Sequence, residues 1–189
     1  MNSFYTQEEL AGLGFKSIGS NVLISRKASI YGAKNITIGN NVRIDDFCVL
    51  SGKIDLGNHI HLAVGSCYFA GSAGIEIHDF VGVSSRTAIY AESDDFSGYA
   101  MPNPVVPDKY RNVTSQKVIL HKHVLIGTGC TILPGSEIGE GTSVGSMSLV
   151  TKSLEPWGMY VGIPCRKIKD RDKRILQLEK DFLTEYESQ

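Results

Sequence analysis

The chain lacks a long hydrophobic run, an excess of either charge, and a closely spaced pair of cysteines. No apolar stretch in its 189 residues approaches the roughly 20 residues that span a bilayer, so we expect no membrane span. Its 19 basic and 20 acidic residues leave a formal charge of −1, which excludes the strongly basic surface typical of nucleic-acid binding. Residues 1–10 include two glutamates and lack the apolar core of a secretory signal.

The four cysteines are far apart in the sequence and form no CxxC pair. Two of them, Cys48 and Cys130, fall at inward positions of the repeat described next, where a free thiol behaves as a small hydrophobe. Together with the missing secretory signal, this pattern predicts a reduced, cytoplasmic protein.

An apolar residue returns at every sixth position along most of the chain. The residue after it is usually small or turn-forming, and the fourth residue after it is compact, as in Val42, Cys48 and Thr87. Neither a helical period nor strict alternation explains this pattern, whereas a hexad supplies one short flat strand and one corner of a prism. The apolar series consists of Ile38, Ile44, Leu50, Leu56, Leu62, Ile77, Val83, Ile89, Leu120, Ile126, Ile132, Ile138, Val144 and Val150.

Three such hexads make a coil of about 18 residues, and coils stack on one another. The sequence therefore predicts an all-β solenoid, with residues 1–189 as a single domain. We expect a helical cap over 1–20, hexapeptide coils over 21–168 and an amphipathic helix over 169–189. At the start of the cap, Thr6 followed by Glu9 is a candidate capping box.

A long insertion, residues 91–117, interrupts the hexads. It holds three of the six prolines and contains no histidine. A structureless insertion of this length in a compact repeat is more often functional than accidental, although a tolerated surface excursion is the alternative.

The hexads, the insertion and the ending GIPCRKI (162–168) resemble the hexapeptide-repeat acyltransferases of left-handed parallel β-helix fold, in the galactoside, maltose and xenobiotic acetyltransferase branch. The whole chain is more narrowly similar to N-acetyltransferases of dTDP-3-amino-3,6-dideoxyhexoses, through MNSFYTQEEL, RIDDFCVLSGKI, SSRTAIYAESDDFSG and SLVTKSLEPWG. The resemblance implies acetyl-CoA as cosubstrate and a nucleotide-sugar substrate for O-antigen and related surface glycans. It also implies a homotrimer with active sites between neighbouring subunits.

The acetyl-CoA site implied by the resemblance follows one edge of the solenoid. Thr128 and Ser146 are one coil apart in sequence, so we expect one to lie above the other, and the resemblance gives both to the pantetheine arm. It places Thr151, Lys152 and Arg166 near the nucleotide end, where cationic side chains neutralise phosphates. For the basic residues around Arg166, a solvated charge run is the alternative.

The acceptor side departs from the galactoside-type pattern. There a histidine opens the insertion and acts as general base on a sugar hydroxyl, whereas here Asp94 stands at that place. A hydroxyl needs a positioned base, but a neutral amine is already nucleophilic and mainly needs orientation. The change therefore favours an amine acceptor, with Asp94 and Asp95 holding the incoming ammonium. A turn-capping role in the loop is the alternative for this pair.

Four further residues are expected on the acceptor side. The resemblance places Arg86 and Tyr90 among the substrate-binding residues. His61 falls where galactoside-type enzymes place a tyrosine that touches the sugar, which makes it the second catalytic candidate. His123 follows the insertion and lies either near the thioester or in a hydrogen bond at a corner.

Other functions remain open on the sequence alone. An O-acetyltransferase would use Asp94 or His61 as an unusual base. The histidine pairs His59/His61 and His121/His123 suggest a zinc-dependent β-helix hydratase as an alternative. No ligand set of suitable spacing accompanies them, so we expect no metal. A structural solenoid without catalytic activity is the last alternative.

Overall fold

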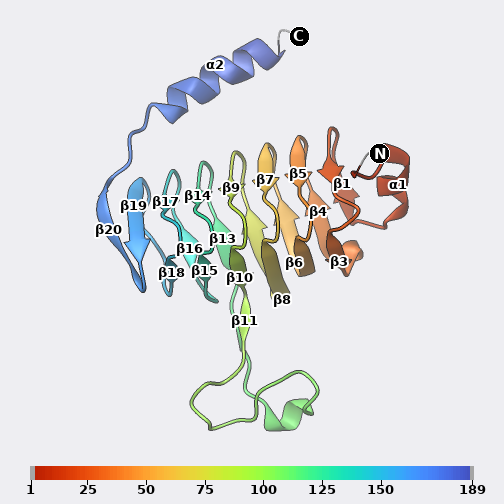
Figure 1. Ribbon diagram of the computed structural model, residues 1–189, viewed down its shortest axis with the longest axis vertical. Coiled ribbons are helices and arrows are strands. Elements are labelled where there is room, and N and C mark those ends of the chain that lie inside the picture. The colour runs from red at the N-terminus through yellow and green to blue at the C-terminus, as the bar shows by residue number, and fades with distance from the viewer. Residues whose placement is uncertain (1–2, 188–189) are drawn as a thin grey trace.

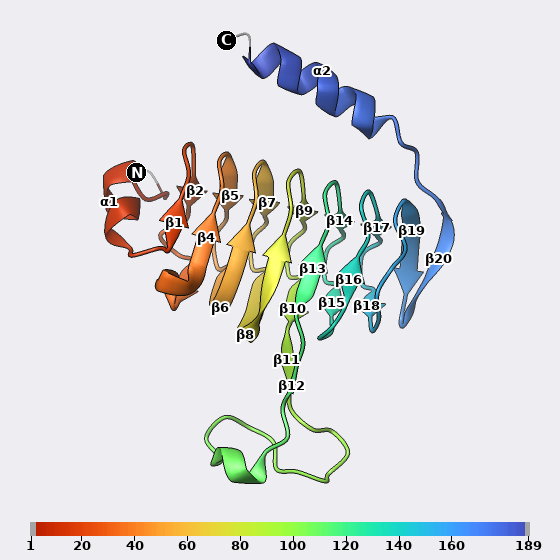
Figure 2. The same ribbon diagram turned by 180° about the vertical axis from the view of Figure 1, so that it is seen from behind.

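The computed structural model describes residues 3–187 as a three-sided parallel β-solenoid, with its ends covered and one loop projecting from its side (Figures 1 and 2). Residues 1–2 and 188–189, which belong to the expected terminal segments, lie outside the described residues. Within residues 3–187, no helix is long and apolar enough to cross a membrane.

The first face is an eight-stranded sheet that is parallel except for its last pair. Its strands, in spatial order, are β2 (Leu23–Ile24), β5 (Val42–Ile44), β7 (Ile60–Leu62), β9 (Gly82–Val83), β14 (Leu125–Ile126), β17 (Ser143–Val144), β19 (Gly158–Gly162) and β20 (Cys165–Asp170).

The second and third faces belong to one ten-stranded sheet, because two long strands turn the corner between them. These strands are β6 (Val49–Leu56) and β8 (Cys67–Ile77). The second face also contains β3 (Ser29–Tyr31), β10 (Ala88–Tyr90), β15 (Thr131–Ile132) and β18 (Leu149–Val150). The third face also contains β1 (Ser17–Ile18), β4 (Ile36–Ile38), β13 (Val118–Leu120) and β16 (Glu137–Ile138).

The core is the column of hexad side chains inside the prism. Every apolar residue of the predicted series from Ile38 to Val150 is at most 3% exposed, so the hexad prediction is confirmed. Burying one such side chain contributes about 1.5–3 kcal/mol to folding. The compact positions are buried as well, and two of their hydroxyls bind corner carbonyls: Ser66 donates to Ala63 (2.8 Å) and Ser148 to Gly145 (2.6 Å).

Both ends of the solenoid are covered. At the first, α1 (Gln7–Gly12) begins with the predicted capping box, in which Thr6 Oγ1 accepts from the Glu9 amide and the Glu9 carboxylate accepts from the Thr6 amide. At the other, β20 pairs antiparallel with β19 and occupies the sheet edge that β19 would otherwise leave open.

The C-terminal helix begins later than expected. Helix α2 spans Ile175–Glu187, whereas Lys169 and Asp170 belong to β20. The predicted start at residue 169 was wrong because this charged segment forms the edge strand. Helix α2 runs back along the solenoid on the side away from the projecting loop (Figures 1 and 2).

The insertion is partly ordered by backbone pairing, not structureless throughout. Its two ends form an antiparallel ribbon, β11 (Glu92–Ser93) with β12 (Thr114–Ser115), and a short 3-10 helix, η2 (Asp108–Tyr110), lies near its tip. A second 3-10 turn, η1 (Ala33–Asn35), precedes β4. The ribbon carries the loop away from the faces of the prism (Figure 1).

The corner glycines set how closely successive coils approach. A Cβ on Gly127 would lie 2.5 Å from the backbone nitrogen of Ser146 in the next coil. We therefore expect Gly127→Ala to destabilise the protein by about 1–3 kcal/mol, as overpacking does when backbone must shift. Chemical denaturation measures this change, and Gly12→Ala is the control because nothing lies within 4 Å of its Cβ. Equal stability of the two variants would contradict the close corner contact.

Candidate functional site

One edge between the first and second faces presents small residues from consecutive coils. The register that pairs Ile126 with Val144 places Gly127 beside Gly145 and Thr128 beside Ser146. The Met147 amide donates to the Thr128 carbonyl (2.8 Å), which confirms the predicted stacking of Thr128 and Ser146. Because these residues are small, the edge exposes backbone that a long, extended ligand can contact.

The edge continues in both directions. Toward the N-terminal end, Ser84 and Ser85 follow β9, and Ser85 Oγ lies 2.6 Å from Thr128 Oγ1. Toward the C-terminal end, the edge reaches Val161 and Gly162, where the Gly162 amide donates to Ser148 Oγ (3.0 Å). The edge therefore leads from Ser84 to the turn that precedes β20.

A cavity of about 580 Å³ lies at that C-terminal end and brings together Thr151, Lys152 and Arg166. All three residues are exposed. Within residues 3–187, neither Lys152 nor Arg166 forms an ion pair, whereas the neighbouring Lys167 is paired with Asp170 (2.7 Å). Of the three cations that line the cavity, Lys167 is therefore neutralised by a neighbouring carboxylate, whereas Lys152 and Arg166 are not, among residues 3–187.

Asp94 lies in the projecting loop, where its carboxylate orders the chain around it. Asn103 donates its amide to Oδ2 (3.0 Å), and Arg111 donates Nη2 to Oδ1 (3.2 Å). These two bonds hold the pKa of Asp94 below its ordinary value, so the side chain is a carboxylate at neutral pH. It remains 30% exposed and so can still be reached by a ligand.

Asp95 caps the next turn of the loop. Its carboxylate accepts from the Ala100 amide (2.9 Å) and from the amide and hydroxyl of Ser97 (3.0 and 2.8 Å). These bonds lower the pKa of Asp95. They correspond to the turn-capping alternative and leave Asp94 as the carboxylate better placed for a ligand.

Glu92 anchors the base of the loop, a role that the sequence analysis did not assign. Its carboxylate accepts from the Ser72 amide (2.9 Å), the Ser72 hydroxyl and the Ser115 hydroxyl. A Cβ on Gly71 would collide with the Glu92 side chain, so this contact requires glycine there. The loop is thereby fixed to the preceding coil.

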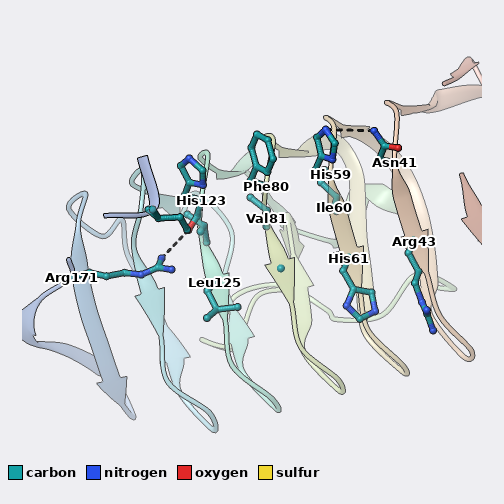
Figure 3. A pocket seen from close by; sticks show the side chains of 13 residues that line it. Asn41, Arg43, His59, Ile60, His61, Phe80, Val81, His123, Leu125 and Arg171 are labelled. Atoms are coloured by element: carbon teal, nitrogen blue, oxygen red, sulfur yellow. Dashed lines mark hydrogen bonds between the residues drawn. The ribbon is translucent and has the colours of Figure 1, made fainter. Parts of the chain in front are cut away.

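His61 lies on the first face, on the strand next to Arg43 (Figure 3). Asp45 accepts from Arg43 Nε (2.7 Å), and its other oxygen lies 2.8 Å from His61 Nε2. Burial raises the pKa of Asp45, but the bonds from His61 and Arg43 outweigh it and leave this pKa below its ordinary value. His61 is half exposed, and its ring is oriented by an ionised partner.

His123 is 2% exposed and lies at the corner that α2 covers. Its Nε2 lies 2.8 Å from a Glu179 carboxylate oxygen, and its ring stacks on Phe80 (5.4 Å). Burial raises the pKa of Glu179, but the contacts with Lys122 and His123 lower it by more. The pKa therefore lies below its ordinary value, and the carboxylate is ionised. These contacts agree with the corner hydrogen bond that the sequence left open.

Arg86 and Tyr90 are the two ends of segment 86–90, which leads into the loop. Arg86 is exposed at a corner, with left-handed backbone (φ 57°). Tyr90 ends β10 on the second face and stacks on Phe69, with 5.1 Å between ring centroids.

The candidate residues are not gathered into one site within a single chain. The cavity lined by His61 is formed by the first face and residues near α2, and its lining does not include Asp94. Asp94 lies in the loop that leaves the far end of β10 (Figure 1). No group of three histidine, cysteine, aspartate or glutamate side chains that could hold a metal ion exists among residues 3–187.

Comparison with known proteins gives consistent matches. Residues 117–152 match the family model described as bacterial transferase hexapeptide (six repeats). The chain is 45% identical over 183 residues to dTDP-4-amino-4,6-dideoxy-D-glucose acyltransferase of Escherichia coli, covering 95% of each chain.

Among solved structures, the chain is similar to AntD, an N-acyltransferase from Bacillus cereus. An Asp94→Ala variant of AntD with dTDP and coenzyme A is 55% identical to it, with a TM-score of 0.97 and coverage of 98% of this chain and 100% of that one. A second AntD structure, changed at Ser84, holds dTDP-4-amino-4,6-dideoxyglucose and coenzyme A (TM-score 0.96, 55% identity, 98% and 99% coverage). A third contains 3-hydroxybutyryl-CoA (TM-score 0.97, 55% identity, 99% and 100% coverage). The near-complete superposition confirms the predicted left-handed parallel β-helix.

Proposed function

The chain belongs to the hexapeptide-repeat acyltransferases, and from this membership we propose that it transfers an acyl group from acyl-CoA to the amino group of dTDP-4-amino-4,6-dideoxyglucose. The observation that carries this proposal is the likeness, over nearly the whole chain, to an enzyme solved with that sugar and coenzyme A. From the sequence alone, we expected the amine at C3 of the hexose. The proposal places it at C4, because the relatives' names specify a 4-amino sugar.

We assign the donor to the edge from Ser84 to Gly162 and the cavity beyond it. The small residues along this edge admit the pantetheine arm against exposed backbone. Lys152 and Arg166 line the cavity and have no carboxylate partner among residues 3–187, which suits the phosphates at the nucleotide end of coenzyme A. The reacting thioester then lies toward Ser84.

We assign the acceptor side to Ser84, Asp94 and His61. Asp94 is a carboxylate at neutral pH and accepts from the sugar ammonium until the amine loses its proton. The amine attacks the thioester carbonyl, its nitrogen–carbon bond forms, and the carbon–sulfur bond breaks. Two protons leave the nitrogen in total: the ammonium gives the first to solvent before the attack, and the leaving thiolate takes the second, so this step needs no histidine base.

We propose a homotrimer, since one chain keeps Asp94 in its loop and His61 on a distant face. The loop also exposes Phe96 and Tyr99, at 94% and 92%, which is unusual for aromatic side chains without a neighbouring surface. A neighbouring subunit would cover these rings and receive the loop. We place the reaction in the cytoplasm and its product in surface glycans such as O-antigen.

The acceptor assay tests the function directly. Wild-type protein with acetyl-CoA or 3-hydroxybutyryl-CoA is expected to acylate dTDP-4-amino-4,6-dideoxyglucose and to leave its 4-hydroxy counterpart unchanged. Asp94→Asn should lower kcat/KM roughly ten- to a thousandfold, because orientation and one charged hydrogen bond contribute about 1.4–4 kcal/mol. Faster acylation of the hydroxy sugar would identify an O-acyltransferase instead.

The donor cavity predicts a selective effect on the acyl-CoA substrate. Lys152→Ala and Arg166→Ala should each raise the KM for acyl-CoA roughly tenfold and change the acceptor KM little, as expected for lost phosphate contacts. Steady-state kinetics measures both constants, and Lys169→Ala is the matched control because that lysine is exposed and does not line the cavity. An unchanged acyl-CoA KM in the double variant would contradict the assignment.

The oligomeric state can be measured directly. Analytical ultracentrifugation of the active protein should give three times the chain mass of 20.6 kDa. A fully active monomer would contradict a site built between neighbouring subunits.

A further inference from the structure

The loop replaces one corner of the solenoid. In the two preceding coils, β6 and β8 run through the corner between the second and third faces without a break, and Gly52 pairs with Gly71 there. In the next coil, β10 ends at Tyr90 and β13 begins at Val118, so residues 91–117 take the place of this corner (Figure 2). The direction of the loop therefore depends on how its base is attached to the coils on either side.

The base of the loop lies between two glycines, one in each neighbouring coil. Gly71 belongs to the coil before it, and Gly135 belongs to the coil after it. A Cβ on Gly71 would collide with the Glu92 side chain, and a Cβ on Gly135 would collide with the Gln116 side chain. Both ends of the loop therefore lie against bare backbone, and they are joined by the bond from the Gln116 amide to the Ala91 carbonyl (2.9 Å).

Glu92 joins three parts of the chain through one carboxylate oxygen. Its Oε1 accepts from the Ser72 amide (2.9 Å), the Ser72 hydroxyl (3.2 Å) and the Ser115 hydroxyl (3.2 Å). Ser72 lies in β8 of the preceding coil, and Ser115 is the residue opposite Glu92 in the ribbon. The carboxylate thus ties both strands of the ribbon to the neighbouring coil.

The ribbon is too short to fix its own direction. Strands β11 and β12 pair through two residues each, and a two-stranded ribbon of that length is marginal without further contacts. Beyond the ribbon, Asp94 binds Asn103 and Arg111 and so holds the outer part of the loop together. The orientation of this ordered outer part relative to the prism therefore depends on the contacts at the base.

We propose that Glu92 is a positioning residue for Asp94, because it sets the direction of the ribbon and thereby the place of the Asp94 carboxylate on the acceptor side. This inference rests on the proposed function, in which Asp94 accepts from the sugar ammonium. Asp94 follows Glu92 by two residues, about 7 Å of extended chain, so a tilt of about 10° at the base moves it by about 1 Å. A displacement of that size lowers the rate of an oriented reaction by up to about a hundredfold.

Kinetics of the full-length protein with dTDP-4-amino-4,6-dideoxyglucose and the better of the two acyl-CoA donors tests this role. Glu92→Ala removes all three bonds and should lower kcat/KM for the amino sugar about ten- to a hundredfold, leaving the KM for acyl-CoA unchanged. Glu92→Gln keeps an acceptor oxygen at the same place and should restore most of the activity. Glu137→Ala is the matched control, because Glu137 also binds a side chain across coils, that of His121, but lies outside the loop.

A double variant separates positioning from a direct contact with the substrate. If Glu92 acts only through Asp94, Glu92→Ala should cause no further loss in an Asp94→Asn background, so the double variant and Asp94→Asn should have the same kcat/KM. A contact of Glu92 with the sugar would instead give two losses that multiply.

Hydrogen exchange measures the loop without any substrate. In Glu92→Ala, exchange should become about tenfold faster at the amides of the ribbon, because its attachment to the neighbouring coil is lost. Exchange should stay at the wild-type rate in residues 95–111, which the bonds of Asp94 and Asp95 hold together. A loop that merely unfolds would exchange faster throughout.

Four results would each overturn the inference. They are wild-type kcat/KM in Glu92→Ala, equal losses in Glu92→Ala and Glu92→Gln, multiplying losses in the double variant, and faster exchange throughout the loop. If the wild type does not acylate the amino sugar but exchange in Glu92→Ala rises only at the ribbon, the proposed function fails and the assignment of Glu92 to the orientation of the loop stands.

Discussion

The structure depends on the register between coils. Each strand hydrogen-bonds to the equivalent strand of the next coil, so a residue's neighbour across the sheet is set by the length of one turn. Inside, this register aligns apolar side chains into a continuous column. Outside, it aligns polar residues along faces and edges, which is how Thr128 comes to lie beside Ser146. A shift of one residue in any coil would break both arrangements together.

The sequence predicts the solenoid well because its constraint is local and repeated. A residue such as Ile126 needs only its position in the hexad to be placed inside, and its burial follows. The two departures both come from pairing between distant segments. Lys169 and Asp170 were predicted to begin a helix, because the sequence alone does not show that they pair with the edge of β19. The ribbon of β11 and β12 joins residues separated by the whole loop.

The candidate site is less predictable for the same reason. Asp94 stands out because it replaces an expected histidine, and its contacts with Asn103 and Arg111 are consistent with an ionised group. Ser84 carries no such signal, since a serine after a hexad position resembles any corner residue. Only its place at the head of the edge draws attention to it. The contact between His61 and Asp45 could have been predicted from the sequence, because Asp45 directly follows β5, the strand that pairs with β7.

The regular edge from Ser84 through Gly127 and Gly145 to Val161 has a consequence for size. Three coil steps of about 4.8 Å each separate its ends, so the edge is roughly 14 Å long. In the proposed assignment, this length separates the reacting end of the donor from its phosphate end. The length of the edge can change only in whole steps, since a coil is either present or absent. Gain or loss of one coil would therefore change the length of carrier arm that the protein can span, while leaving the chemistry at either end intact.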